Sequence, residues 1–254
     1  MKLNKLVLAA GTVLLVAACG GSSSDDKKPA PTTAPAPTAT STALPTPGPA
    51  VSSFGGSALS TTNSSNINFE TVSSGDLKKV VINGTPYALS GGTVKGLNGT
   101  YTGDTKKGVI YNNLTQSSFG YVLDNAGVAH GLAQGNLTAE TDMPIIGKAT
   151  YKGDSVFYSN SAKDASHGTF TAEVDFGTKE LDLDLDLPVP SSVVKNQDTE
   201  IDDITFSGNS FQGVSTHNNM AVKGNFFGPQ ASEIGGTYIL SNWKGTGAFG
   251  GTRQ

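Results

Sequence analysis

The stretch that decides the fold is Gly224-Asn225-Phe226-Phe227-Gly228-Pro229-Gln230-Ala231-Ser232-Glu233-Ile234-Gly235-Gly236-Thr237-Tyr238, with Phe249-Gly250-Gly251-Thr252-Arg253 close to the C-terminus. Gly228-Pro229 cannot continue a strand ladder and favours a turn, and Gly235-Gly236 lets the backbone bend where a side chain would clash. Aromatic residues stand on both sides of this break, as at a barrel corner with one buried face. The stretch therefore predicts the closing end of an antiparallel β-barrel.

The residues before this stretch supply the other strands. In residues 169–176 and 181–187, apolar residues alternate with Thr, Glu or Asp, which is the period of a strand with one dry face. Gly177-Thr178-Lys179 is expected to turn the chain between them. Further strands are expected at 201–206, 210–213, 220–227, 236–242 and 247–253, and residues 146–158 are expected to form a strand pair broken at Gly153-Asp154. About eight strands in residues 142–254 suit a small closed up-and-down barrel filled by its own side chains.

Residues 51–141 are expected to form a separate, smaller β-rich domain. Asn83-Gly84 between residues 77–82 and 86–89 is a strong hairpin signal. Residues 108–111 and 118–123 read as further strands, and no helical stripe longer than about two turns is visible. The predicted fold class is therefore all-β, with this domain followed by an eight-stranded antiparallel barrel.

The N-terminus has the features of an export signal. Lys2 and Lys5 precede a short apolar run, which ends in the small residues before Cys19. This arrangement resembles a bacterial lipobox, so residues 1–18 are expected to be a lipoprotein signal peptide and Cys19 to carry the lipid. A plain secretory peptide with a chance cysteine is the alternative. The apolar run is shorter than the ~20 residues that a membrane-spanning helix needs.

Residues 19–50 are rich in Ser, Asp and Lys and then in Pro, Ala and Thr. Such a segment cannot bury enough apolar surface to fold, and its prolines stiffen it. We expect a tether between the outer membrane and the folded part, and a proline-rich ligand for a partner domain is the alternative reading.

Composition and motifs argue against several functions. The net charge of −4 and the lack of a basic stripe disfavour nucleic-acid binding. Cys19 is the single cysteine, so an intramolecular disulfide is excluded. Residues 245–250 match GxGxxG, but a dinucleotide site needs a helix after the glycines and the chain ends four residues later. With no GxSxG, P-loop or HExxH motif, we expect no enzymatic activity.

The barrel region contains a series of ordered motifs. They are Gly147-Lys148-Ala149-Thr150-Tyr151-Lys152-Gly153, Gly168-Thr169-Phe170, Val174-Asp175-Phe176-Gly177, the stretch quoted first, and the C-terminal Phe249-Gly250-Gly251-Thr252-Arg253. Together these motifs resemble the transferrin-binding protein B family of Gram-negative surface lipoproteins. The resemblance covers residues 144–254 and implies that residues 51–141 are the "handle" domain of one handle-plus-barrel lobe. A full transferrin-binding protein B has two such lobes, whereas this chain has room for one. That difference favours a single-lobe, hemophilin-like relative that binds haem or haemoglobin.

The histidines are the candidate haem ligands. His130 lies in a glycine-flanked stretch near the end of the handle, His217 lies in a loop, and His167 begins a barrel strand. His130 and His217 are the candidate ligand-binding residues, although a surface role is the common one for a loop histidine. No paired spacing supports zinc. Asp182, Asp184 and Asp186 could suggest calcium, but one strand face spreads them by ~7 Å per pair, which favours a solvated outer face.

The sequence thus predicts a surface-exposed, lipid-anchored protein of the outer membrane without catalytic residues or a firmly implied cofactor. It would bind a host iron source, either haem, haemoglobin or a transferrin-like protein, and pass it to a TonB-dependent receptor. Immune evasion by binding a complement regulator such as factor H is the alternative, and an adhesive or structural role is a third. The candidate contact loops are residues 124–134, 188–197 and 213–219, because recognition is often carried by loops on a common frame.

Overall fold

A computed structural model describes residues 53–63, 66–72, 74–87, 93–95, 100–104, 108–187, 199–215, 219–240 and 245–254. The signal peptide, Cys19, the tether, the loop at 188–197 and His217 lie outside these residues. The described residues all belong to one unit, residues 47–254. No helix among them is long and apolar enough to span a membrane.

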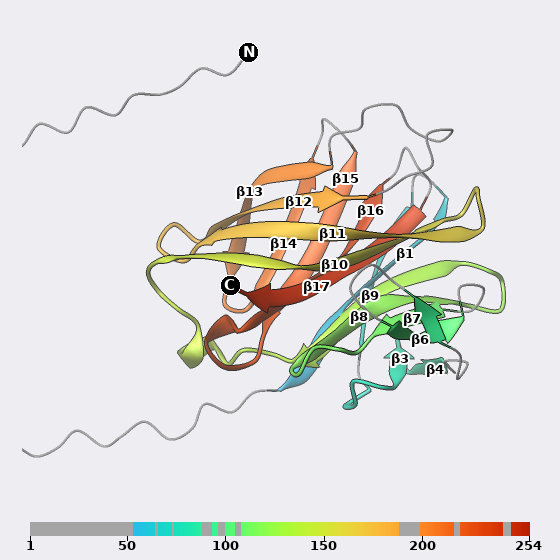
Figure 1. Cartoon of the computed structure of the whole chain (residues 1–254), viewed down its shortest axis with the longest axis horizontal. Helices are drawn as coiled ribbons and strands as arrows, with labels where there is room; N and C mark the ends of the chain where they lie inside the picture. The colour runs from blue at the N-terminus through green and yellow to red at the C-terminus, as the bar shows by residue number, and fades with distance from the viewer. Residues whose placement is uncertain are drawn as a thin grey trace, which may run out of the picture. The chain divides into compact units, whose positions relative to one another are not determined.

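A seven-stranded antiparallel sheet forms the first part of the chain (Figure 1). Its spatial order is β2-β1-β9-β8-β7-β6-β5. A separate hairpin, β3-β4, bridges to the end of β2 through Val72 and Ile82. The strands are β1 (Phe54–Asn63), β2 (Asn66–Thr71), β3 (Val80–Ile82), β4 (Thr85–Tyr87), β5 (Thr93–Lys95), β6 (Thr100–Asp104), β7 (Gly108–Tyr111), β8 (Ser117–Leu123) and β9 (Ala129–Asn136).

The second part is a closed eight-stranded antiparallel barrel, which confirms the predicted fold class. It follows the short 3₁₀ helix η1 (Glu140–Asp142), and a second one, η2 (Pro229–Ala231), joins β15 to β16. The barrel strands are β10 (Lys148–Ser159), β11 (Asp164–Asp175), β12 (Glu180–Asp186), β13 (Glu200–Ser207), β14 (Ser210–Ser215), β15 (Met220–Phe227), β16 (Glu233–Leu240) and β17 (Gly245–Arg253).

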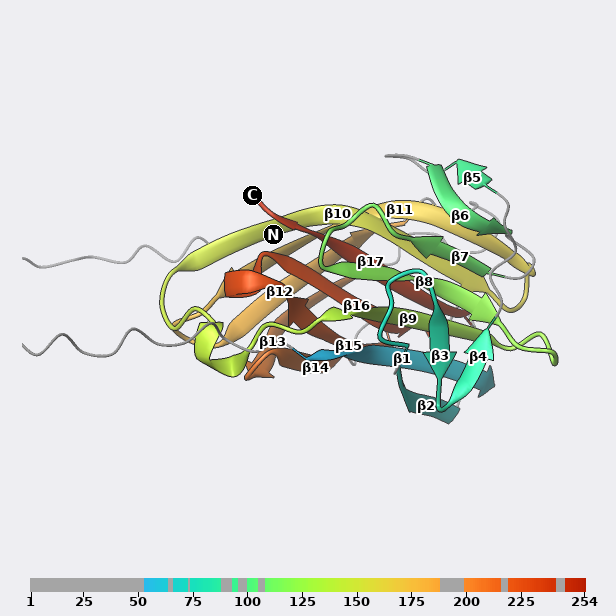
Figure 2. The same cartoon turned by 90° about the horizontal axis from the view of Figure 1, so that it is seen from below.

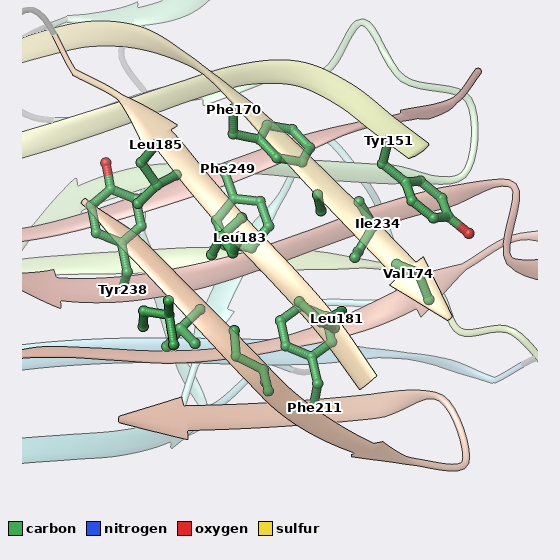
Figure 3. Packing of buried hydrophobic residues seen from close by; sticks show 14 of the residues in the cluster. Tyr151, Phe170, Val174, Leu181, Leu183, Leu185, Phe211, Ile234, Tyr238 and Phe249 are labelled. Atoms are coloured by element: carbon green, nitrogen blue, oxygen red, sulfur yellow. The ribbon is translucent and has the colours of Figure 1, made fainter. Parts of the chain in front are cut away.

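Strand alternation fills the barrel with side chains. On β12, Leu181, Leu183 and Leu185 are buried while the intervening aspartates are exposed, which confirms the predicted solvated face. Figure 3 shows these leucines beside Phe170, Tyr238 and Phe249, which come from other strands and point into the same core. The interior is therefore a packed core.

One departure from strict alternation has a local cause. Ile201 and Ile204 on β13 are both buried although three residues apart. The register of β12 and β13 shifts between them, and Asp203 adopts φ 55°. The Asp203 amide donates to Asp182 Oδ1 at 2.9 Å. A β-bulge thus inserts the extra residue that returns Ile204 to the core face.

One glycine-based break was predicted wrongly, because β10 runs unbroken through Gly153-Asp154. Gly235-Gly236, where the sequence predicts a bend at a position too crowded for a side chain, lies inside β16, which begins at Glu233 and not at residue 236. A Cβ on Gly153 would stand 2.2 Å from the Gly250 carbonyl oxygen, and one on Gly236 would stand 2.8 Å from the Phe249 ring. These glycines permit close approach of a neighbouring backbone or ring. The predicted breaks at Asn83-Gly84, Gly177-Thr178-Lys179 and Gly228-Pro229 are confirmed.

The alternation of β12 generates a stability test. Leu183 is fully buried, so Leu183→Ala should lower the free energy of unfolding by about 2–5 kcal/mol. The neighbouring exposed change Glu180→Gln should alter it by less than about 0.5 kcal/mol. Urea denaturation followed by tryptophan fluorescence measures both, and equal effects would contradict the assigned face.

Candidate functional site

A buried carboxylate joins the seven-stranded sheet β2-β1-β9-β8-β7-β6-β5, which we call the handle sheet, to the barrel. Glu233, the first residue of β16, is 3% exposed. Its Oε1 accepts hydrogen bonds from the Thr115 amide at 2.9 Å, the Thr115 hydroxyl at 2.9 Å and the Gln116 amide at 3.1 Å. Its Oε2 accepts one from the Ser117 hydroxyl at 2.7 Å. Because charged acceptors form strong hydrogen bonds and a buried charge must be compensated, this residue fixes the entry to β8 against the barrel.

An apolar interface continues from this point. The handle strands β8 and β9 lie along the outer face of β16 and β17 (Figure 2). Tyr121 and Ala133 of the handle share a buried cluster with Val156, Tyr158 and Ala248 of the barrel. The Thr246 hydroxyl donates to the Leu59 carbonyl at 3.1 Å. The handle sheet thus covers the outer face of β16 and β17.

His167 belongs to the junction as well. It lies inside β11, beyond the strand start at Asp164, and its Nδ1 contacts the Tyr111 hydroxyl of β7. Burial lowers the pKa of His167, while the nearby Asp154 and Asp164 charges oppose this shift. The Nδ1 atom of a neutral imidazole can accept a hydrogen bond from the Tyr111 hydroxyl, whereas a protonated imidazole cannot accept one. His167 therefore has a structural partner.

His130 lies in strand β9, between two carboxylates from other segments. Its Nδ1 is 2.8 Å from Glu70 Oε2 on β2, and its Nε2 is 3.6 Å from Asp124 Oδ2 in the turn after β8. The Tyr87 ring packs against it at 5.6 Å between centroids. Burial lowers the pKa of His130, but the hydrogen bond and charge of Glu70 and the charge of Asp124 outweigh it, so the pKa is raised overall. The imidazolium form therefore suits this position.

Two of the three predicted contact loops, residues 124–134 and 213–219, are partly strand in the structure. Residues 129–134 belong to β9, so only the Asp124 turn of the first region is a loop, and the Asp124 carboxylate closes it by accepting from the Ala126 and Val128 amides. Gly213 lies within β14. Residues 245–250, which match GxGxxG, lie within strand β17. This agrees with the rejection of a dinucleotide site there. His130 faces Asp124 through an Nε2 atom that is itself buried among the described residues, so it is not presented to an incoming iron atom in this arrangement.

The barrel end at which β10 begins has a feature that the sequence interpretation missed. Ile145 and Ile146, in the linker before β10, are 80% and 78% exposed. A hollow of about 670 Å³ lies next to them along the chain, with a lining that includes Lys148, Glu173, Asp175, Glu180, Asp182 and Arg253. The signal in the sequence is two adjacent isoleucines between Pro144 and Gly147, of which Ile146 falls at the start of the strand pair expected at 146–158.

The fold and junction define a class: a single lobe in which a handle sheet covers one side of a closed, filled barrel. Residues 143–253 match the family described as the C-lobe and N-lobe β-barrels of transferrin-binding protein B. The barrel is therefore of the transferrin-binding protein B type, which confirms the resemblance seen in the sequence.

Solved structures share the fold across both parts of the chain. The isotype 1 transferrin-binding protein B of serogroup B Neisseria meningitidis aligns with a TM-score of 0.54 and 20% identity, over 79% of this chain and 43% of that one. The haemoglobin receptor HpuA of Kingella denitrificans, in complex with human haemoglobin, aligns with a TM-score of 0.51 and 18% identity, over 80% of this chain and 88% of that one.

A curated relative matches in sequence over a shorter span. The neisserial heparin binding antigen of Neisseria meningitidis serogroup B is 30% identical over 117 residues, which is 43% of this chain and 23% of the relative. This chain thus spans less than a quarter of the length of that relative. By their names, these proteins bind transferrin, haemoglobin or heparin.

The junction can be tested at Glu233. Removing the carboxylate leaves the Thr115 and Gln116 amides without their acceptor, so Glu233→Ala should lower the free energy of unfolding by on the order of 3 kcal/mol. Glu233→Gln keeps one acceptor oxygen and should cost less. Glu173→Ala, on an exposed position of β11, serves as the matched control. A Glu233→Ala variant as stable as this control in chemical denaturation would show that the carboxylate does not hold the junction.

The junction should also depend on pH through His167. Its folded pKa lies below the unfolded value of about 6.5, so its contribution is complete above that value and is lost as pH falls through the lower folded pKa. His167→Gln, which cannot titrate, should show a smaller loss of melting temperature between about pH 7.5 and 5 than wild type. Identical pH profiles for the two proteins would refute a buried neutral histidine.

Proposed function

We propose that this protein is a non-enzymatic, lipid-anchored lipoprotein of the bacterial surface that binds a host iron protein and delivers its iron or haem to an outer-membrane receptor. The barrel type carries the proposal, because the relatives of this barrel are binding proteins by name. Cys19 as the lipidated residue, residues 19–50 as the tether and a TonB-dependent receptor as the recipient are parts of the same proposal.

The packed barrel supports binding on the outside of the lobe. Aromatic and aliphatic side chains from all eight strands occupy the barrel interior, including Tyr151, Phe170, Phe226, Tyr238 and Phe249. A ligand therefore has to meet the barrel ends, the outer strand faces or the handle. A host protein, which offers a large surface, suits such a scaffold better than a small molecule that needs an enclosed pocket.

Haemoglobin is the first ligand to test, because the HpuA structure that shares this fold is a complex with human haemoglobin. Heparin is disfavoured by charge, since β12 exposes Asp182, Asp184 and Asp186 and its neighbours expose Glu173 and Glu200, all of which repel a sulfated polymer. Free haem is a narrower version of the proposal, in which His130 or His217 ligates the iron.

Binding to immobilised full-length protein tests the proposal. We expect human haemoglobin or human transferrin to bind with a Kd on the order of 1 µM or tighter by surface plasmon resonance. Heparin, run as a parallel analyte, should bind weakly. Binding of factor H alone would instead support the complement-evasion alternative, and absence of binding to both iron proteins would refute the proposal.

A separate experiment tests the narrower proposal that the protein binds free haem. Titration with haemin should produce a shifted Soret band that is lost in His130→Ala or His217→Ala if either residue ligates iron, and His167→Gln is the matched control. A spectrum that all three variants leave unchanged would remove these histidines from the ligand set.

A further inference from the structure

Two large aliphatic side chains are exposed side by side on a fixed segment. Ile145 and Ile146 are 80% and 78% exposed, whereas most other large apolar side chains of the described barrel are buried. Isolated exposed apolar residues are ordinary, but an adjacent pair on a linker is a compact apolar protrusion. Residues that fill a well-packed, desolvated pocket on a partner carry much of the binding energy of a protein interface.

The flanking residues fix the position of this pair. On one side, Met143 packs against the barrel core and its amide contacts the Glu140 carbonyl at 3.4 Å. On the other side, Gly147 adopts φ 92°, which favours glycine, and its carbonyl accepts from the Phe176 amide at 2.9 Å. The backbone on both sides therefore holds the pair toward solvent. Binding would cost little conformational entropy, because this segment is already ordered.

The surface beside the pair is acidic. The lining of the hollow that begins at Lys148 carries five carboxylates, from Glu173, Asp175, Glu180, Asp182 and Asp203, against the cations of Lys148 and Arg253. Lys148 is already paired with Asp175 at 3.2 Å. The remaining field is negative and would attract basic side chains while repelling an anionic membrane surface.

This end of the barrel is also the end at which the handle begins. The Ser53 carbonyl accepts from the Leu137 amide, and the following Thr138 bonds to Gly228 in the turn between β15 and β16. The Asp142 carboxylate accepts from the Gln230 amide of the same turn. In Figure 1 the yellow-green chain between β9 and β10 runs past this barrel end.

We propose that this end is a protein-docking surface, in which Ile145 and Ile146 enter an apolar socket on the partner and the acidic hollow faces a rim of Lys and Arg around that socket. The inference rests on the proposed function, because the partner is taken to be the host iron protein. It adds the surface that makes the contact and the chemistry that the partner must offer.

A double variant with a control on strand β2 tests this surface. Ile145→Ser with Ile146→Ser should weaken binding of human haemoglobin or human transferrin at least tenfold. Ile67→Ser changes another exposed aliphatic residue, 38% exposed, on β2 and should leave binding unchanged. Glu180→Lys and a rise from about 50 to about 500 mM NaCl should each weaken binding, because both reduce the attraction to a basic rim.

The outcomes separate the two proposals. Wild-type affinity in the double variant, with a normal melting temperature, would overturn the docking surface and leave the proposed function intact. Failure of the wild-type protein to bind either iron protein would refute the proposed function and this inference together. Binding of the wild type, but not of the double variant, to anionic phospholipid vesicles without any iron-protein effect would assign the pair to a membrane surface instead.

Discussion

The structure of this lobe depends on the buried charge of Glu233. A carboxylate taken out of water is costly unless hydrogen bonds surround it, and here the donors come from Thr115, Gln116 and Ser117 on the other side of the junction. The handle therefore completes the solvation of a barrel residue. The same barrel turn bonds to Thr138 and Asp142 in the linker, so the stretch that closes the barrel also positions the segment that starts it. Folding of the barrel end and docking of the handle are coupled by this arrangement.

The sequence was sufficient to predict the strands and the barrel, because the alternation of buried and exposed residues in a strand repeats every two residues and is visible locally. The Leu and Asp alternation of β12 placed the barrel face correctly, and Asn83-Gly84 placed a hairpin with positive φ at both residues. Glycine residues did not distinguish a turn from a crowded position inside a strand. The same residue type marks the turn at Gly177 and the crowded strand position at Gly153, where the neighbouring Gly250 carbonyl excludes a side chain. Only the pairing of β10 with β17, about 100 residues apart in the chain, distinguishes the two cases.

The roles of His130, Glu233 and the exposed isoleucines were harder to predict, because they too depend on strand pairing between distant parts of the chain. His130 was identified as a residue of interest, but Glu70, its nearest partner, lies 60 residues earlier and reaches it through the pairing of β1 with β2 and β9. Glu233 precedes the strand predicted at 236–242, so nothing in the local sequence indicates that it is buried. Ile146 looks in the sequence like the start of a strand, whereas both it and Ile145 are exposed. Hydrophobicity alone does not tell which face a residue takes where no alternation surrounds it. Long-range pairing, rather than local pattern, decides each of these roles.

Hydrogen exchange tests the central claim, which is that Glu233 makes the handle and barrel one cooperative structure. Native-state exchange measured against denaturant should give the same opening free energy for amides of β8 and β9 as for those of β16 and β17 in the wild type. In Glu233→Ala, the handle strands should open at a distinctly lower free energy than the barrel strands. Separate opening of handle and barrel in the wild type, unaffected by Glu233→Ala, would contradict the account.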